Sequence, residues 1–206
     1  MQLDLYKALL FVIESAKSKR PLSDSFLKEI ASYVMRNTGA VYNTALGSFD
    51  SSKGDFRLLN VRAGTTQFID HSKVAGMIDS FCNEINNKVA QIKSVDDALI
   101  TSFDAHFNVV SIHPFADGNG RVSQLVMNYI QYLFGLPLSS VFKEYKAEYY
   151  KALIDTREFE NIEIFRTFMV MQYEKMITDE IRKVTSAHQE HHMGISKNSI
   201  FKACSF

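Results

Sequence analysis

The sequence of 206 residues has only two cysteines, no net charge and no apolar run long enough to cross a membrane. Cys82 and Cys204 lie far apart, which argues against a disulfide framework and favours a reducing compartment. Because 23 basic residues balance 23 acidic ones, nucleic acid is not expected as the main partner. The N-terminal apolar run, Leu9 to Ile13, follows an acidic Asp4 and is not a secretion signal. These absences predict a cytoplasmic protein without a membrane segment.

The chain does contain enough apolar material for one core, because 46% of its residues are hydrophobic. We place a single domain at residues 1–190 and a C-terminal tail at 191–206. Apolar residues recur at helical spacing along most of the chain, and only the stretch 40–70 has strand-like pieces, which predicts a mainly α fold. The expected helices are 3–17, 23–39, 73–92, 94–112, 121–134 and 163–184, and the expected strands are 57–62 and 66–69.

Helix ends and buried faces can also be predicted. Ser23 and Ser94 precede helical patterns and are expected N-caps, because a serine hydroxyl can accept a backbone N–H of the first turn. In the last helix, apolar residues recur from Phe165 through Met169 to Ile181 as one continuous stripe. Such a stripe of methionines and aromatic residues is expected in the core, not at a cofactor site.

Nine residues beginning at His113, His-Pro-Phe-Ala-Asp-Gly-Asn-Gly-Arg, carry most of the groups that a nucleotide polyphosphate requires. An imidazole has an ordinary pKa near neutrality, so His113 can take a proton from a hydroxyl group. Asp117 is a hard oxygen ligand of the kind that holds Mg²⁺ together with substrate phosphates. Gly118 and Gly120 flank Asn119 and allow the backbone to bend tightly and bring its N–H groups against an anion. The stretch therefore predicts a phosphate site.

The sequence that follows is helical from Arg121 onward, so the glycine turn leads into a helix N-terminus, which favours anions. A cation such as Arg121 is unfavourable there unless an anion is bound, and its guanidinium fork suits phosphate oxygens. Taken singly, these residues have simpler explanations: a structural histidine, a surface turn and, in Phe115, a buried anchor for the loop. Seven specified positions in a fixed order rarely occur by chance, so the joint pattern favours a functional site.

These nine residues resemble the signature of the Fic family, His-x-Phe-x-Asp/Glu-Gly-Asn-Gly-Arg-x-x-Arg. Upstream, Asn60 to Phe68 resembles the β-hairpin flap with which Fic proteins dock a target segment. Downstream, Phe142 to Leu153 is similar to the family's helix with a Glu-x-Tyr-Tyr element, here Glu148-Tyr149-Tyr150. The resemblance implies a Fic-type helical bundle with a small β-hairpin flap near the active-site loop. The flap residues that it assigns are Arg62, Ala63, Gly64, Thr65, Thr66, Gln67 and Phe68.

By the same resemblance, the protein would transfer a nucleoside monophosphate, usually AMP from ATP, onto a Ser, Thr or Tyr hydroxyl of a target protein. His113 would be the general base, Asp117 the ligand of Mg²⁺ or Mn²⁺, and Phe115 the hydrophobic anchor of the loop. The residues that would bind the phosphates are Gly118, Asn119, Gly120 and Arg121.

One position departs from the signature, because its closing arginine, which contacts the γ-phosphate in relatives, is Gln124 here. Glutamine carries no charge and cannot offer a fork of donors, and losing such a contact costs about 1.5–3 kcal/mol of phosphate binding. If Gln124 is a phosphate ligand, the reaction is slower or differently oriented, and Gln124→Arg should tighten ATP binding or raise the rate. If Gln124 instead contacts protein, the same substitution should lower stability.

Two other functions stay open. One is a protein phosphotransferase like the related Doc toxins, which replace the second glycine of the anion cradle with lysine, whereas Gly120 is retained here. The other is a nucleotide-binding interaction domain with weak or no activity, because Gln124 replaces the arginine.

The tail carries two further patterns. His188, His191 and His192 have a spacing that permits a metal site on one helix face, but no cysteine or orienting partner accompanies them, which favours a solvated tail. Ser186-x-x-x-Glu190 matches part of the Fic inhibitory pattern, Ser/Thr-x-x-x-Glu-Gly/Asn, although a histidine replaces the final small residue. The arginine that pairs with the inhibitory glutamate is absent. Whether an inhibitory partner or segment acts on the protein is left open.

Overall fold

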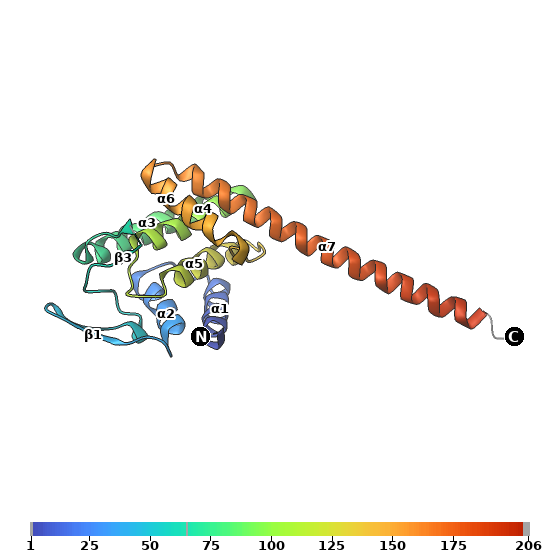
Figure 1. The fold of residues 1–206 in the computed structure, drawn as a ribbon, viewed down its shortest axis with the longest axis horizontal. Helices are drawn as coiled ribbons and strands as arrows, with labels where there is room; N and C mark the ends of the chain where they lie inside the picture. The colour runs from blue at the N-terminus through green and yellow to red at the C-terminus, as the bar shows by residue number, and fades with distance from the viewer. Residues whose placement is uncertain (1, 65, 204–206) are drawn as a thin grey trace.

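The computed structural model describes the backbone of residues 2–64 and 66–203 and the side chains of residues 3–64 and 66–186. Within these ranges the fold consists mainly of helices with two short antiparallel hairpins, which confirms the predicted fold class (Figure 1). The helices are α1 (Gln2–Lys17), α2 (Asp24–Met35), α3 (Val74–Gln91), α4 (Val95–Ile112), α5 (Asn119–Leu133), α6 (Lys146–Glu158) and α7 (Ile162–Ala203). The strands are β1 (Val41–Thr44), β2 (Gly47–Asp50), β3 (Arg62–Ala63) and β4 (Thr66–Gln67).

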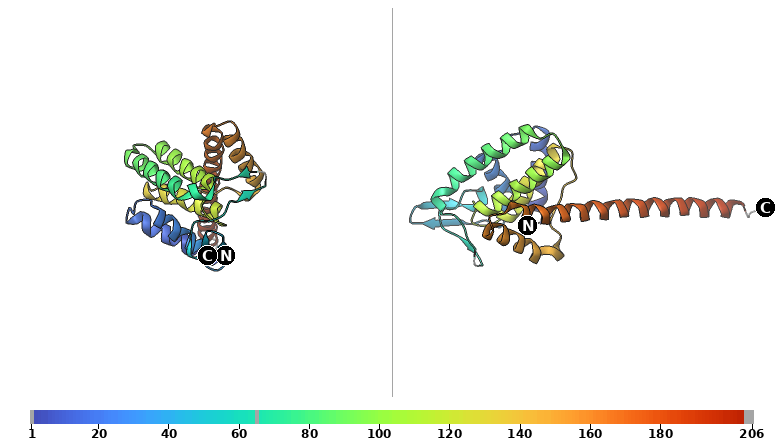
Figure 2. Two further views of the ribbon diagram at one scale, coloured as in Figure 1. Left: turned by 90° about the vertical axis from the view of Figure 1, so that its left-hand side faces the viewer. Right: turned by 90° about the horizontal axis from the view of Figure 1, so that it is seen from above.

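Helix α5 lies between two hydrophobic clusters. On one side, Val126 joins side chains of α1, α2, α3 and α4, among them Phe26 and Ile30. On the other side, Met127 belongs to a second cluster with α4, α6 and α7, which includes the buried ring of Phe165. Packing on both sides fixes α5 within the body of the molecule (Figure 2). The glycine-rich loop that precedes α5 is therefore attached to a rigid element.

Both predicted N-caps are confirmed. The hydroxyls of Ser23 and Ser94 accept backbone N–H groups of the first turns of α2 and α4 at 3.1 and 3.0 Å. Helix α2 ends earlier than predicted, at Met35, and the N–H of Gly39 donates back to the Met35 carbonyl at 2.7 Å. The predicted helix end at Gly39 was therefore wrong, although Gly39 does bond back to the last residue of the helix.

The strand predictions need correction. Strand β3 begins only at Arg62, and the preceding residues are not a strand because the side chain of Arg57 turns inward and bonds main-chain carbonyls. The hairpin formed by β1 and β2 was not predicted. It is held by an antiparallel ladder and by stacking of Tyr42 on Phe49, with ring centroids 4.8 Å apart. Most of its residues are at least partly exposed, so its sequence lacks the alternation that identifies a half-buried strand.

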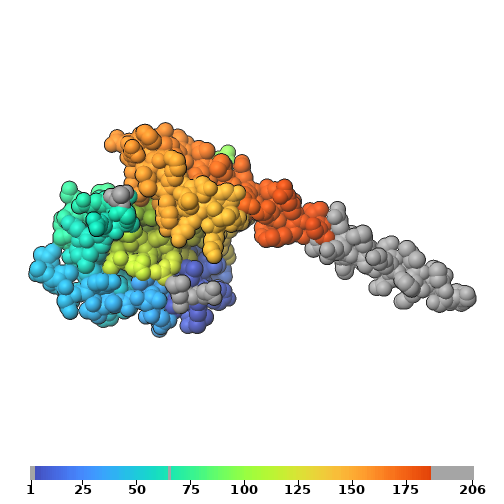
Figure 3. Space-filling view, viewed as in Figure 1, coloured from blue at the N-terminus to red at the C-terminus, as the bar shows by residue number. Residues whose placement is uncertain are grey.

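The apolar stripe of α7 is core only in its first part. Phe165 and Met169 are buried, but Ile181 is 60% exposed. By that point the helix has left the body of the molecule, and residues 181–186 are all exposed (Figures 1 and 3). The expectation of a continuous buried stripe was therefore wrong beyond the packed segment, because periodicity does not reveal where the neighbouring helices end.

Some sequence predictions concern parts of the chain that are not described. The side chains of His188, His191 and His192, the side chain of Glu190, and Cys204 lie outside the described residues. The division between domain and tail at residue 190 stays a prediction. Cys82 is a buried free thiol. Along the described helices, no stretch combines the length and the apolar character needed to span a bilayer.

Candidate active site

The motif forms the loop between α4 and α5. His113 ends α4 with a left-handed backbone, φ 54°, and its N–H donates to the Val109 carbonyl at 3.0 Å. The buried side chain of Asn119 closes the loop, since its Oδ1 accepts the N–H of Phe115 and its Nδ2 donates to the Phe115 carbonyl, both at 2.9 Å. The Phe115 ring is buried in the core. The side chain of Asn119 therefore shapes the loop, and only its backbone N–H is left for an anion at the helix start.

The two glycines of the loop meet different surroundings. Gly118 directly precedes α5 with φ 81°, and a Cβ at this position would lie 2.8 Å from the sulfur of Met35. Its left-handed backbone conformation favours glycine, and any Cβ there would also force the Met35 side chain to move. A Cβ on Gly120, in the first turn of α5, would meet no atom within 4 Å. The backbone at Gly120 borders open space, which allows an anion to approach the N–H groups at the start of the helix.

Asp117 and Arg121 lie on either side of this helix start. The Asp117 carboxylate is exposed, accepts the N–H of Gly118 at 2.6 Å and lies 3.5 Å from Nη2 of Arg121. The other contacts of the guanidinium group, to the sulfur of Met35 and the carbonyl of Val34, are 3.3 and 3.5 Å long. Both contacts are weak, because a thioether sulfur is a poor acceptor and 3.5 Å is long for an N–H···O bond. The guanidinium group can therefore exchange them for phosphate oxygens.

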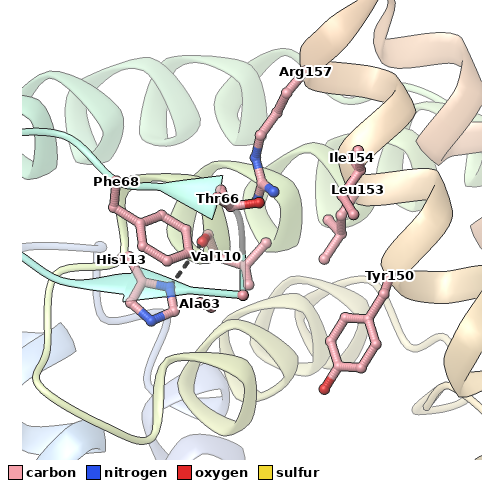
Figure 4. Close-up of a pocket in the computed structure, with 10 residues that line it drawn as sticks. Ala63, Thr66, Phe68, Val110, His113, Tyr150, Leu153, Ile154 and Arg157 are labelled. Carbon is pink, nitrogen blue, oxygen red and sulfur yellow. Dashed lines mark hydrogen bonds between the residues drawn. The ribbon is translucent and has the colours of Figure 1, made fainter.

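The imidazole of His113 lies against the flap (Figure 4). Its ring stacks on Phe68, with centroids 3.7 Å apart and planes 14° from parallel. Its Nδ1 lies 3.2 Å from the carbonyl of Val110. A carbonyl can only accept, so this contact assigns the proton of the neutral ring to Nδ1. Nε2 then carries the lone pair and is the atom that can accept a proton.

Burial lowers the pKa of His113 to about 4. The charges of Arg57 and Arg157 act in the same direction, whereas the bond to the Val110 carbonyl and the charge of Asp117 raise the pKa. The ring is therefore neutral at neutral pH, as a general base must be. Its basicity is modest until an anion binds nearby.

A cavity of about 450 Å³, which we call the flap pocket, lies between the flap and α6 (Figure 4). Its walls are largely apolar and include Val110, Leu153 and Ile154. The polar groups at its edge include His113 and the guanidinium group of Arg157, which contacts the hydroxyl of Ser111 at 3.2 and 3.3 Å. Sequence reasoning did not single out Arg157. The pocket brings apolar surface next to the candidate base.

The predicted flap residues divide into two groups. Four of them line the flap pocket: Ala63, Gly64, Thr66 and Phe68. Arg62 and Gln67 are cross-strand partners in the hairpin and are exposed. Thr65 lies outside the described residues. The hairpin is therefore both a wall of the pocket and an exposed edge.

A second cavity of about 350 Å³, the α5 pocket, opens at the start of α5. Gly120, Arg121 and Gln124 line it from α5, and Lys143 and Lys146 line it from the turn before α6 and the first residue of α6. Tyr150 borders both cavities. The two cavities therefore adjoin at the ring of Tyr150.

Arg57 is a site residue that sequence reasoning missed. Its side chain is only 1% exposed. Nε donates to the carbonyl of His113 at 2.8 Å, Nη1 to that of Leu59 at 2.8 Å, and Nη2 to that of Ile69 at 2.7 Å. One buried guanidinium group therefore joins the chain before the flap, the chain after it and the backbone of the candidate base. A single arginine within an apolar stretch gives no sequence signal of this role.

The model of the Fic/DOC family matches residues 21–131, which is more than half of the chain and includes the whole motif loop. The chain belongs to the Fic/DOC family. Among curated Fic proteins, the protein adenylyltransferase Fic of Aedes aegypti is 31% identical over 115 residues, and fic-1 of Caenorhabditis elegans is 30% identical over 115 residues. The match covers 55% of this chain and 22% of each relative, so the chain spans about a fifth of their length.

Solved Fic structures share the fold. A Fic-1 fragment from Caenorhabditis elegans superposes with a TM-score of 0.72 at 23% identity, over 89% of this chain and 51% of that chain. A Fic domain containing signaling protein from Bacteroides thetaiotaomicron superposes with a TM-score of 0.71 at 19% identity, over 85% of this chain and 68% of that chain. At these identities the likeness concerns the fold alone.

This Fic domain uses Gln124 as an internal contact. The Nε2 group of Gln124 donates to the carbonyl of Ser139 and lies 3.4 Å from Oδ1 of Asn128. The side chain borders the α5 pocket, but its amide donors are directed to protein acceptors. Of the two expectations for this position, the geometry agrees with the one in which Gln124 contacts protein.

Proposed function

We propose that the domain transfers AMP from ATP onto a Ser, Thr or Tyr hydroxyl of a target protein. The observation that supports this best is the position of His113, whose neutral imidazole lies at the edge of the flap pocket in the loop that leads to the N-terminus of α5. A base is thus placed between a pocket that suits a nucleoside and a helix end that suits its phosphates. The curated relatives are named protein adenylyltransferases, which agrees with this assignment.

In this proposal the nucleoside occupies the flap pocket. Its apolar walls and the rings of Phe68 and Tyr150 suit a flat base, and the cavity of about 450 Å³ is large enough for a nucleoside. The phosphates then extend past Tyr150 towards the first turn of α5 and the guanidinium group of Arg121. The open space at Gly120 favours this path. A lysine at this position, as in Doc proteins, would occupy that space.

The reaction needs one base and one leaving-group site. Nε2 of His113 accepts the proton of the target hydroxyl while the hydroxyl oxygen bonds to the α-phosphorus. The bond between the α-phosphorus and the pyrophosphate oxygen breaks, and Arg121 together with the N-terminus of α5 binds the pyrophosphate that leaves. The products are the AMP-modified protein and pyrophosphate.

Asp117 fits a metal that arrives with the nucleotide. Mg²⁺ is commonly held by one or two carboxylates together with substrate phosphates, and the exposed Asp117 carboxylate lies beside the helix end where those phosphates are expected. Among the described residues, no group of three or more His, Cys, Asp or Glu side chains could hold a metal by itself. When bound, Mg²⁺ or Mn²⁺ would neutralise charge on the phosphates.

The hairpin of β3 and β4 fits an extended target segment. Each strand of a two-stranded hairpin has one unpaired edge, whose main-chain groups can bond another strand. The exposed residues Arg62 and Gln67 stand on this hairpin, and its inner face borders His113 through Phe68. A target segment added to this edge would bring its hydroxyl towards the base.

Incubation with a cell lysate and ATP that carries a label on either the α- or the γ-phosphate tests the proposal. We expect a target protein to take up the α-label and to gain the mass of AMP. Transfer of the γ-label would indicate a Doc-like phosphotransferase, and labelling from neither would indicate a nucleotide-binding interaction domain. His113→Ala should reduce α-label transfer by about 100-fold or more while ATP still raises the melting temperature. Normal transfer by this variant would contradict the role of His113.

A further inference from the structure

The α5 pocket has a one-sided charge. Arg121, Lys143 and Lys146 line it, and none of the described residues that line it is acidic. The chain as a whole has equal numbers of acidic and basic residues, so this pocket is a local excess of positive charge. A concave site with three cations and without a carboxylate favours an anion that carries several charges.

All three cations stand at the start of a helix. Arg121 lies in the first turn of α5, Lys146 is the first residue of α6, and Lys143 begins the short 3₁₀ helix that leads into α6. A helix N-terminus carries a partial positive charge, so a cation there is unfavourable unless an anion is present. No capping side chain bonds the first turn of either α5 or α6. The start of α5 therefore leaves backbone N–H groups for a ligand, whereas at the start of α6 the N–H of Lys146 already donates to the Lys143 carbonyl, so α6 contributes the side chain of Lys146.

The two lysines have no acidic partner. Within the described part of the chain, neither ammonium group of Lys143 or Lys146 forms an ion pair with a carboxylate. Lys151, on the same helix, does pair with Asp155 at 2.5 Å. Lys146 instead lies 5.7 Å from the ring centre of Tyr150, the residue that the two cavities share. Its charge is thus directed to the point where a nucleotide passes from one cavity to the other.

Three glutamines hold the segment that leads to Lys143. The Gln124 amide donates to the carbonyl of Ser139, and Gln131 accepts the N–H of Ser139 at 2.9 Å. Gln172 of α7 accepts the N–H of Phe142 at 3.1 Å. Gln124 stands where the family signature has its second arginine, and here its side chain anchors the segment next to the lysines instead of contacting the ligand.

We infer that Lys143 and Lys146 bind the distal phosphates of the nucleotide in place of the missing arginine of the signature. The inference rests on the proposed function, because it takes a nucleoside triphosphate as the ligand. Two flexible ammonium groups replace one planar fork, so binding depends on charge more than on fixed geometry. The lysines would bind the β- and γ-phosphates of ATP. AMP lacks these two phosphates, and pyrophosphate consists of them alone.

A comparison of ligand affinities tests this inference. Binding of ATP, AMP and pyrophosphate would be measured by calorimetry for the wild type and for the variant Lys143→Gln/Lys146→Gln, in which both exposed side chains keep nearly their full length. We expect affinity for ATP and for pyrophosphate to fall by about tenfold or more, and affinity for AMP to change by less than about twofold. Lys151→Gln is the matched control and should leave all three unchanged. The melting temperature of each variant reports whether it is folded.

The outcomes separate this inference from the proposed function. Unchanged ATP affinity in the double variant, or an equal loss for ATP and AMP, overturns the role of the lysines even if the wild type transfers AMP. Selective loss of ATP and pyrophosphate binding supports it even if no AMP transfer is found. A wild-type protein that binds neither ATP nor pyrophosphate overturns the inference together with the proposed nucleotide site.

Discussion

At the scale of single residues, the site combines groups whose surroundings fit them for particular tasks. His113 is kept neutral by burial and oriented by the Val110 carbonyl and the Phe68 ring. Asn119 uses its side chain to close the loop, so that the backbone at the start of α5 can face a ligand. These arrangements depend on main-chain carbonyls and N–H groups, which a sequence motif does not display.

The pKa of His113 leads to a testable pH dependence. Its value is lowered from 6.5 to about 4, so the ring stays neutral as the pH falls through 6.5 and becomes protonated only near pH 4. We expect the NMR titration midpoint of the His113 ring in the free protein to lie below pH 5. We also expect that protonation of His113 does not lower kcat/KM as the pH falls through 6.5. A midpoint near 6.5 would contradict the burial argument.

The same shift affects stability. Above pH 6.5 the imidazole is neutral in both the folded and the unfolded chain, so it has no effect. Between about pH 6.5 and pH 4 the unfolded chain binds a proton that the folded His113 does not, and the free energy of unfolding therefore falls as the pH falls. Burial lowers the pKa of His106 to about 3, which adds a loss of the same sign.

At the scale of elements, the flap and the base form one unit because Arg57 bonds both ends of the flap and the carbonyl of His113. Arg57→Met would leave three carbonyls without this donor, at a cost of about 1–3 kcal/mol for each group that becomes buried and unpaired. We expect faster amide hydrogen exchange at residues 58–69 and a lower melting temperature. Arg57→Lys, which restores one donor group, should lie between this variant and the wild type. Unchanged exchange at the flap in a destabilised Arg57→Met variant would show that Arg57 stabilises the core alone.

The elements also show what could be predicted from the sequence. Helices were predictable where a serine cap precedes an apolar period, as at Ser23 and Ser94. The nine-residue motif placed the loop next to a helix N-terminus, but α5 begins at Asn119, two residues before the predicted Arg121, so Gly120 lies in its first turn. The inward turn of Arg57 depends on the carbonyls of Ile69 and His113, which lie 12 and 56 positions further along the chain. The orientation of Gln124 depends on the carbonyl of Ser139, 15 positions further along. Local sequence patterns do not contain such contacts.

At the scale of the whole molecule, α5 connects two hydrophobic clusters, and the segment that leads to α6 is fixed by glutamines from α5 and α7. The α5 pocket therefore lies beside the helix that joins the two hydrophobic clusters. Positive charge in this pocket opposes folding unless a ligand is bound, because like charges are brought together. Binding of a polyphosphate in the α5 pocket should therefore raise the free energy of unfolding.

Gln124→Arg tests this linkage. The substitution removes the amide that bonds the Ser139 carbonyl and adds a fourth cation beside Arg121, Lys143 and Lys146. We expect the melting temperature without nucleotide to fall by several degrees, since 1 kcal/mol corresponds to roughly 2–4 °C in a domain of this size. We also expect ATP to raise the melting temperature by more than it does in the wild type, because the added charge is neutralised by the phosphates.

Gln124→Leu is the matched control, because it removes the same hydrogen bond without adding charge. At roughly 0.5 M salt, charges more than several ångströms apart are screened from one another. If repulsion destabilises Gln124→Arg, this salt concentration should restore part of the stability of Gln124→Arg and none of that of Gln124→Leu. If Gln124→Arg instead keeps the wild-type melting temperature and accelerates transfer, then position 124 faces the γ-phosphate. The lysines would then supplement the signature arginine and would not replace it.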